Sequence, residues 1–276
     1  MGIPNFLCIG MQKGGTTWLY DVIKQHPSIT NMPAKEFVFF NNFSIPEHNE
    51  WPVYHRRRQA LESLRLEITK GSQLERDEKF FERLEWFNLF SKLDVDIDWY
   101  EKLFDIVPEH KIAGDYSPDY IMLPRKAIRD IKDIYPEIKA VLSVRNPVDR
   151  AWSHMKMIVR NEGLDIKDVS NLLNVAKRSD VLRRGHFIED LENWKDIFQD
   201  DFLYYKFDAI NIEPLKIIRK VCDLLEIEFN LEYFINYEDK VFSGQTAAMP
   251  DEVRTFLENT YCKEVDYFEN LPLFTD

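Results

Sequence analysis

The chain has 276 residues, of which 45% are apolar, and a formal net charge of −12. A chain of this size and composition can bury one large core, so we expect a single domain over residues 1–276. The negative charge argues against nucleic acid or a polyanionic glycan as partner, because the long-range field of the protein would repel both. A small or neutral partner molecule is favoured.

Targeting and metal signals are weak in this sequence. The longest apolar runs, 6–9 and 140–142, are far shorter than the roughly 20 residues of a membrane helix. The first six residues carry neither a basic segment followed by a long apolar stretch nor the Ser or Thr that a myristoylation signal needs at position 6. Three cysteines, Cys8, Cys222 and Cys262, are too few and too scattered for a disulfide framework or a zinc site. We therefore expect a cytoplasmic protein without a metal site.

Strand-like and helix-like segments alternate along the chain. Short apolar runs predict strands at 6–9, 111–114, 139–144 and 202–207. Apolar residues at helical spacing follow them, at 19–23, at 124–135, after the capping pair Asn146-Pro147, and at 214–225. This alternation predicts a parallel sheet covered by helices on both faces. The predicted fold class is α/β.

Two further segments have helical patterns. Residues 44–104 are charged and aromatic, with helical spacing at 74–90, and predict a helical insertion. Within it the run Arg56-Arg57-Arg58 could attract an anionic acceptor, although such a run is usually a solvated helix face. Residues 251–271 repeat apolar side chains at helix spacing, which predicts a core-facing C-terminal helix.

The loop from Gly10 to Thr17, which reads GMQKGGTT, has the Gly-x4-Gly frame of a Walker A loop between a strand and a helix. Glycines let successive amides and the helix N-terminus face an anion. Thr16 stands where a Walker loop carries its lysine, and a lysine appears three residues earlier, as Lys13. A loop without that lysine suits a donor with fewer phosphates than a triphosphate. A glycine-rich turn that merely joins strand to helix is the alternative reading.

Two segments resemble one known family. Residues 9–19, IGMQKGGTTWL, resemble the 5′-phosphosulfate loop of sulfotransferases that use PAPS (3′-phosphoadenosine 5′-phosphosulfate), particularly the branch with the heparan-sulfate sulfotransferases. Residues 144–154, VRNPVDRAWSH, resemble the 3′-phosphate motif of that family. The resemblance implies a P-loop-like three-layer fold, with a central parallel sheet flanked by helices. It also implies transfer of a sulfuryl group from PAPS to a hydroxyl or amine, with PAP (adenosine 3′,5′-bisphosphate) as product.

The resemblance also implies which residues bind the donor. They are Gln12, Lys13, Gly14, Gly15, Thr16, Thr17, Trp18, Arg145 and Ser153. Arg145 and Ser153 match the pair that holds the 3′-phosphate, and a dianion is well bound by a permanent forked cation and a hydroxyl. Without the first loop, Arg145-Asn146-Pro147 could be only a capped helix start.

Three residues are candidates for catalysis. In-line transfer depends on positioning and electrostatics, and Lys13 can neutralise the departing phosphate. Residues 35–40, KEFVFF, resemble the family segment that carries a catalytic glutamate, which implies Glu36 as the general base. A partly desolvated carboxylate can have its pKa raised toward neutrality. His154 is the second choice of base. The alternative for His154 is a packed or solvated helix histidine without a catalytic role, and the alternative for Glu36 is an ordinary surface carboxylate.

One further segment supports the resemblance and another departs from it. Residues 115–120, DYSPDY, resemble the Ser-Pro-x-Tyr segment that lines the cleft in this family. Residues 240–245, KVFSGQ, differ from the basic loop with which the branch binds the donor. One rival is a P-loop kinase of a small metabolite, which would need Mg²⁺ and a triphosphate grip. A second is a non-catalytic nucleotide-binding module whose charged insertion binds a partner.

Overall fold

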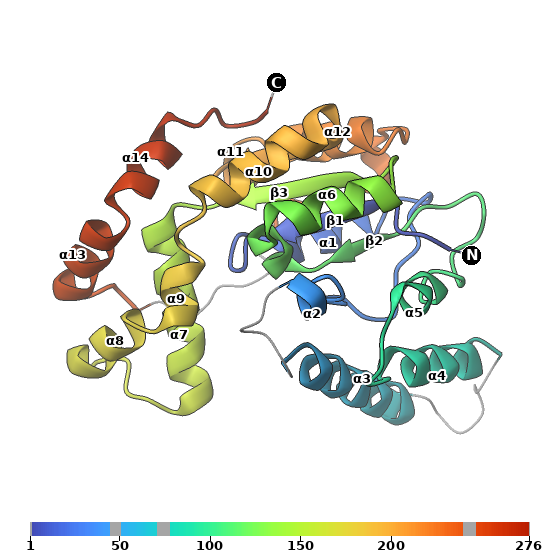
Figure 1. The fold of residues 1–276 in the computed structure, drawn as a ribbon, viewed down its shortest axis with the longest axis horizontal. Coiled ribbons are helices and arrows are strands. Elements are labelled where there is room, and N and C mark those ends of the chain that lie inside the picture. Colours follow the sequence, from blue (N-terminus) through green and yellow to red (C-terminus); the bar gives the residue numbers. More distant parts are fainter. Residues whose placement is uncertain (1, 45–50, 71–77, 240–246, 276) are drawn as a thin grey trace.

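A computed structural model describes residues 2–44, 51–70, 78–239 and 247–275. Within these residues the centre is a parallel sheet with strand order β2-β1-β3-β4 (Figure 1). The strands are β1 (Phe6–Gly10), β2 (Gly114–Tyr116), β3 (Lys139–Val144) and β4 (Phe202–Lys206). Because all four run parallel, their carboxyl ends meet at one edge of the sheet, where α/β proteins bind ligands.

Helices connect the strands. Those described are α1 (Thr16–Ile23), α2 (Asn41–Ser44), α3 (Trp51–Lys70), α4 (Glu78–Phe90), α5 (Ile97–Lys102), α6 (Arg125–Ile134), α7 (Pro147–Glu162), α8 (Val169–Ala176), α9 (Ser179–Arg183), α10 (Ile188–Phe198), α11 (Ala209–Ile212), α12 (Pro214–Leu224), α13 (Asp251–Thr260) and α14 (Cys262–Asn270). A 3₁₀ turn, Pro118–Met122, follows β2. In the described part of the chain, no helix combines the length and apolar character that crossing a membrane requires.

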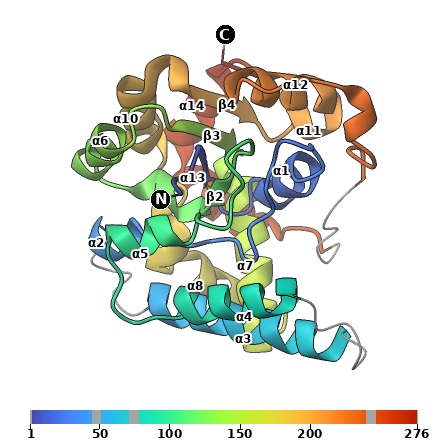
Figure 2. The same ribbon diagram turned by 90° about the vertical axis from the view of Figure 1, so that its right-hand side faces the viewer.

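The sheet forms the middle of three layers. Successive side chains of a strand point to opposite faces, and both faces of β1 are apolar. Leu7 and Ile9 belong to the apolar cluster that includes residues of α6 and α10, whereas Phe6 and Cys8 belong to the cluster that includes residues of α1 and α12. Figure 2 shows these helix pairs on opposite sides of the sheet. Each large apolar side chain buried in this way contributes about 1.5–3 kcal/mol. The predicted parallel α/β architecture is confirmed.

The second strand begins later than predicted. It pairs with β1 from Gly114 to Tyr116, not over 111–114. The residues before it pair elsewhere, because Ile112 forms a parallel bridge with Ile29. The buried Asp115 breaks the apolar pattern of the strand, which is why a hydrophobic run did not mark its position.

The helical insertion is described as α3, α4 and α5, with residues 45–50 and 71–77 outside the described part. The helix predicted over 74–90 is α4, which begins at Glu78, so residues 74–77 of that prediction lie outside the description. Both ribbon views show α3 and α4 on the same side of the sheet as α7 and α8 (Figures 1 and 2).

The predicted C-terminal helix is two helices, α13 and α14. The chain bends at Tyr261, where φ is −108° and ψ is 25°. The bend lets the end of the chain reach a second cluster: Val253, Leu257 and Val265 pack with α7 and α8, whereas Phe268 packs in the cluster of α6 and α10. A continuous helix over 251–271 was therefore wrong.

Candidate active site

The loop between β1 and α1 has the backbone of an anion cradle. Gly15 caps α1 in the left-handed region, with φ of 89°. A Cβ added at Gly14 would lie 2.9 Å from the carbonyl oxygens of Met11 and Ser143, so the turn has no room for a side chain there. The glycines therefore set both the curvature of the loop and its close approach to β3.

The N-terminus of α1 leaves backbone amides for a ligand. Its first internal hydrogen bond joins the amide of Leu19 to the carbonyl of Gly15 at 3.1 Å, so the amides of residues 16–18 precede it. The indole of Trp18 is buried in the core and donates to the carbonyl of Tyr237 at 2.8 Å. The predicted contribution of Trp18 to donor binding is thus limited to its amide.

Lys13 and Gln12 lie at the tip of this loop. The side-chain oxygen of Gln12 is buried and has no hydrogen-bond partner among the described residues. Burial lowers the pKa of the Lys13 ammonium, and the nearby positive charges of Arg160, Arg145 and Lys156 lower it further. A bound anion would relieve this repulsion, so the electrostatics suit a negatively charged ligand.

Arg145 follows β3 directly and lies against the loop. Its Nη1 donates to the carbonyl of Lys13 at 2.8 Å, and its guanidinium carbon lies 4.4 Å from the ring centroid of Phe207. Burial lowers the pKa of Arg145, while Asp149 and Asp208 act in the opposite direction. Stacking and the loop contact hold the guanidinium in one orientation.

Helix α7 brings the predicted Ser153 to the same region. The Asn146 side chain caps the helix by accepting from the amides of Val148 and Asp149 at 3.0 and 3.4 Å, and Pro147 is the first helical residue, as predicted. Ser153 is half-buried.

Two cations near Lys13 were not predicted. Lys156 and Arg160 follow Ser153 by three and seven residues, which puts all three on one face of α7. That spacing is visible in the sequence and could have identified them. The segment 240–245, where the sequence departs from the basic loop of the resembling branch, lies outside the described residues.

We call residues 35–40 the strap; they carry the predicted base Glu36. The strap amides donate to the last residue of β2 and to the segment after it: Glu36 to the carbonyl of Tyr116 (3.1 Å), Val38 to the hydroxyl of Ser117 (3.0 Å) and Phe39 to the hydroxyl of Tyr120 (2.9 Å). Glu36 and Val38 adopt left-handed backbone angles, with φ of 57° and 47°. Such conformations persist only where the surroundings impose them, and they concentrate at functional sites.

A buried carboxylate organises the groups that hold the strap. Asp115 accepts from the hydroxyls of Ser117 and Tyr120, both at 2.6 Å, from Tyr100 at 3.1 Å and from the amide of Phe37 at 3.4 Å. Burial raises the pKa of Asp115 to about 6, and these hydrogen bonds oppose that rise. At neutral pH the ionised group therefore accepts from all four donors.

The strap and the loop lie at neighbouring strand ends, because β2 pairs with β1. They also approach closely: a Cβ added at Gly10 would lie 2.7 Å from the carbonyl oxygen of Pro118, in the turn that holds the strap.

The side chain of Glu36 is 36% exposed, and its Oε2 lies 2.9 Å from Nε2 of His55 on α3. The insertion therefore reaches the predicted base.

His154 lies in a buried, positively charged setting on α7. Burial, with Arg150 and Arg184 nearby, lowers the pKa of His154 to about 3, so the imidazole stays neutral and is a weak base. Arg184 in turn donates to both carboxylate oxygens of Asp119, at 2.7 and 3.0 Å. This setting favours a packed histidine over a proton acceptor.

The arginine run in the insertion is only partly a solvated face. Arg57 and Arg58 are exposed, donating to the carbonyl of Ser91 at 3.1 Å and to Glu62 at 2.8 Å. Arg56 is fully buried, so the solvated reading is wrong for that residue.

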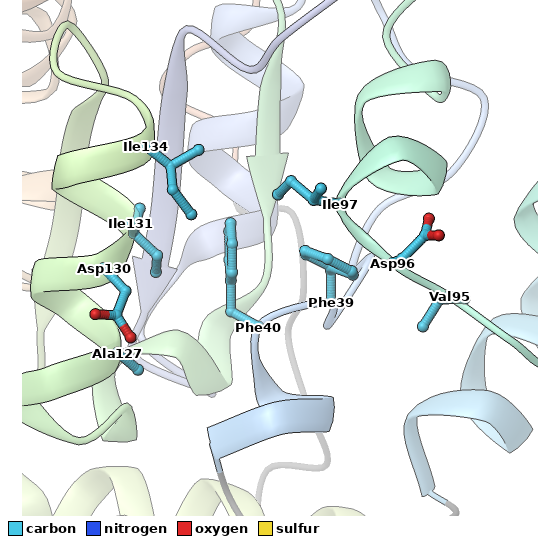
Figure 3. Close-up of a pocket in the computed structure, with 9 residues that line it drawn as sticks. All are labelled: Phe39, Phe40, Val95, Asp96, Ile97, Ala127, Asp130, Ile131 and Ile134. Carbon is cyan, nitrogen blue, oxygen red and sulfur yellow. The ribbon is translucent and has the colours of Figure 1, made fainter.

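A separate apolar hollow of about 360 Å³ lies between the strap, α6 and the segment before α5 (Figure 3). It is lined by Phe39, Phe40, Val95, Asp96, Ile97, Ala127, Asp130, Ile131 and Ile134. Both carboxylates are engaged: Asp96 caps α5 and Asp130 pairs with Lys126. The cations around Lys13 are not among the lining residues, so the hollow is distinct from the anion cradle.

Comparison with known protein sequences identifies the family to which this chain is similar. A sequence profile described as the sulfotransferase family matches residues 4–230. The membrane-associated sulfotransferase kil1 of Dictyostelium discoideum is 24% identical over 71% of this chain and 32% of its own length. The heparan sulfate glucosamine 3-O-sulfotransferase 6 of Mus musculus is 22% identical over 82% of this chain and 53% of its own length. The chain thus spans about a third to a half of these curated relatives.

Solved structures share the fold. A sulfotransferase from Alicyclobacillus acidocaldarius superposes with a TM-score of 0.66, at 22% identity over 98% of this chain and 95% of that one. The sulfotransferase domain of the Synechococcus PCC 7002 olefin synthase has a TM-score of 0.56, at 17% identity over 98% and 96% of the two chains. At these identities the likeness establishes the fold, and the profile match establishes the family. The chain belongs to the sulfotransferase family.

Proposed function

We propose that this protein transfers a sulfuryl group from PAPS to a hydroxyl or amine acceptor. The observation that carries the proposal is the half-buried Lys13, which lies at a glycine cradle beside the positive charges of Arg145, Lys156 and Arg160. PAPS has anionic groups at its 5′ and 3′ positions, and these residues fit both. When bound, it supplies an activated sulfuryl group on a phosphate leaving group.

Each residue has a separate task in this proposal. Lys13, with the amides of residues 15–17, holds the 5′-phosphosulfate and neutralises the charge that develops on the leaving phosphate. The amide of Gly14 instead donates to the carbonyl of Met11 at 2.8 Å and shapes the loop. Arg145 and Ser153 hold the 3′-phosphate through charge-assisted hydrogen bonds. Glu36 takes the proton from the acceptor hydroxyl or amine. The strap, held by the buried Asp115, gives that carboxylate a fixed backbone.

The 3′-phosphate site predicts that PAP stabilises the protein more than 5′-AMP does, because only PAP engages Arg145 and Ser153. Thermal shift measures this difference, since a ligand that binds only the folded state raises its stability as RT ln(1 + [L]/Kd). Arg145→Ala should remove most of the difference, whereas Arg129→Ala, an exposed arginine on α6, should leave it unchanged. Equal shifts with both ligands in the wild type would rule out the assigned 3′-phosphate site.

Metal independence distinguishes the proposal from a P-loop kinase. Transfer from labelled PAPS should continue at an unchanged rate in excess EDTA, because Lys13 supplies the positive charge at the leaving group. ATP should be neither hydrolysed nor used as a phosphoryl donor. A rate that disappears on chelation and returns with Mg²⁺ would favour the kinase.

The proposed acceptor is small or neutral, because the protein carries a net charge of −12. By their printed names, some of the curated relatives instead act on heparan sulfate. A panel of alcohols, phenols, amines and heparan oligosaccharides, each tested with labelled PAPS, separates the two classes. Transfer confined to the oligosaccharides would contradict this part of the proposal.

We propose the cytoplasm as the location of the protein. Its three cysteines are free thiols in the structure, and Cys8 and Cys222 are buried. A reducing compartment keeps such thiols unpaired. Recovery of the tagged protein from a secretory compartment would overturn this assignment.

A further inference from the structure

The carboxylate of Glu36 contacts a residue from a part of the chain that neither the loop nor the 3′-phosphate motif involves. His55, in the second turn of α3, places its Nε2 2.9 Å from Oε2 of Glu36. The contact joins the helical insertion to the strap. The neighbouring Arg56 reinforces the same junction, because its Nη1 lies 3.5 Å from the carbonyl oxygen of Phe37.

The strap backbone is already constrained before His55 acts. Hydrogen bonds from the amides of Glu36, Val38 and Phe39 define its path, and two of these residues have left-handed backbone angles. The remaining freedom lies in the side-chain torsions of Glu36. A glutamate that is 36% exposed would sample several rotamers without a partner for its carboxylate.

His55 is itself held in place by its own helix. The Trp51 ring stacks on the imidazole with a centroid separation of 4.7 Å and an interplanar angle of 21°. The side-chain amide of Gln59 lies 2.6 Å from the same Nε2. An amide NH2 only donates, so when Nε2 carries a proton the amide faces it with its oxygen, which shares that proton with Glu36. Trp51, His55 and Gln59 are spaced by four residues and share one face of α3. The imidazole is thus restrained on both sides along the helix.

We propose that His55 is a positioning residue for Glu36, donating its Nε2–H to Oε2 so that Oε1 faces the acceptor and takes its proton. The inference rests on the proposed function, in which Glu36 is the base. In the transfer step the proton moves from the acceptor to Oε1, and the bond from His55 to Oε2 is kept. His55 is not required to gain or lose a proton.

A positioning role for His55 and a purely structural ion pair predict different effects when the imidazole is removed. Side-chain exposures of 20% for His55 and 36% for Glu36 mean that the contact is solvent-screened and adds little to folding stability. Loss of the imidazole should therefore leave the melting temperature nearly unchanged. A positioning role instead predicts a loss of turnover with donor binding intact.

The test compares His55→Ala and His55→Gln with wild type in the labelled-PAPS assay. His55→Ala should lower kcat by about 10- to 100-fold through misplacement of the base, with the KM for PAPS and the affinity for PAP unchanged. His55→Gln should recover most of that loss, because the glutamine Nε2 can donate from a similar position. Arg58→Ala, which removes another pair on α3, is the matched control and should retain wild-type turnover.

A double-mutant cycle isolates the coupling to Glu36. If His55 acts only through Glu36, Glu36→Gln/His55→Ala should be no slower than Glu36→Gln alone. Effects that multiply would overturn the proposal, as would wild-type kcat in His55→Ala when Glu36→Gln is slow. If Glu36→Gln keeps the wild-type rate, the assignment of the base fails first, and the inference fails with it.

A spectroscopic readout does not depend on turnover. The ¹⁵N resonance of His55 Nε2 should shift in Glu36→Ala, because its hydrogen-bond acceptor is removed. It should stay in place in Glu62→Ala, which changes a carboxylate on α3 that pairs with Arg58. An unshifted resonance in Glu36→Ala would mean that the pair does not form in solution and would overturn the proposal.

Discussion

Lys13→Ala should lower turnover by about 10²–10³-fold, the loss expected when a preorganised charge at a developing anion is removed. The effect should be large because Lys13 is half-buried, and burial in low dielectric strengthens its interaction with the leaving phosphate. PAP affinity should fall as well, since the proposed function assigns the same ammonium to the 5′-phosphate of the product. Rapid quench with labelled PAPS and calorimetry with PAP measure the two effects.

The matched control for Lys13 is Lys263→Ala, an exposed lysine on α14. It should change neither turnover nor PAP affinity. Lys13→Arg keeps the charge but not the compact ammonium, and should recover PAP binding better than it recovers turnover. Wild-type turnover in Lys13→Ala would show that the loop amides alone stabilise the leaving group, and the role assigned to Lys13 would be wrong.

Local sequence patterns were enough to predict the layers of the fold. The predicted third strand has the bounds of β3, because each of its last five side chains is buried and apolar or small. The loop from Gly10 to Thr17 was recognisable because close backbone approach and left-handed angles require glycine at fixed positions. Both features depend on residues adjacent in the chain, which is the information that a single sequence carries.

The features of the fold and of the site that were not predicted from the sequence depend on contacts between distant segments of the chain. Asp115 is polar within a strand, and its burial is tolerable only because Ser117, Tyr120 and Tyr100 donate to it. Nothing in the sequence near Asp115 marks Tyr100 as its partner. His55 likewise lies in an insertion without a recognisable motif, and only the packing of α3 against the strap brings it to Glu36.

The electrostatic surroundings of His154 also could not be predicted from the sequence. His154 follows Ser153 directly, which made it a candidate base, but Arg150 lies one turn earlier on α7 and Arg184 approaches from the end of α9. Together with burial they lower the pKa of His154 to about 3, an effect that no local pattern reports. By contrast, Lys156 and Arg160 could have been found from their spacing after Ser153.

Glu36→Gln should lower turnover by about 10²–10⁴-fold, the usual range for loss of a general base. Glutamine keeps the shape of the side chain and one acceptor oxygen, but it cannot take a proton at any accessible pH. PAP affinity should be nearly unchanged, which separates this variant from Lys13→Ala, where donor binding and turnover fall together. The assay uses whichever acceptor the labelled-PAPS panel identifies, at several pH values between about 6 and 9.

The control for Glu36 is Glu162→Gln, a carboxylate at the end of α7 that pairs with Arg178 at the surface. It should leave turnover unchanged and change stability little, because exposed ion pairs are screened by solvent. The strap should keep its backbone in Glu36→Gln, because the bonds from the amides of Val38 and Phe39 do not involve the substituted carboxylate. A rate close to wild type across the whole pH range, with the fold intact, would mean that another group takes the proton. His154 would then be the next residue to replace, although its low pKa makes it a weak base.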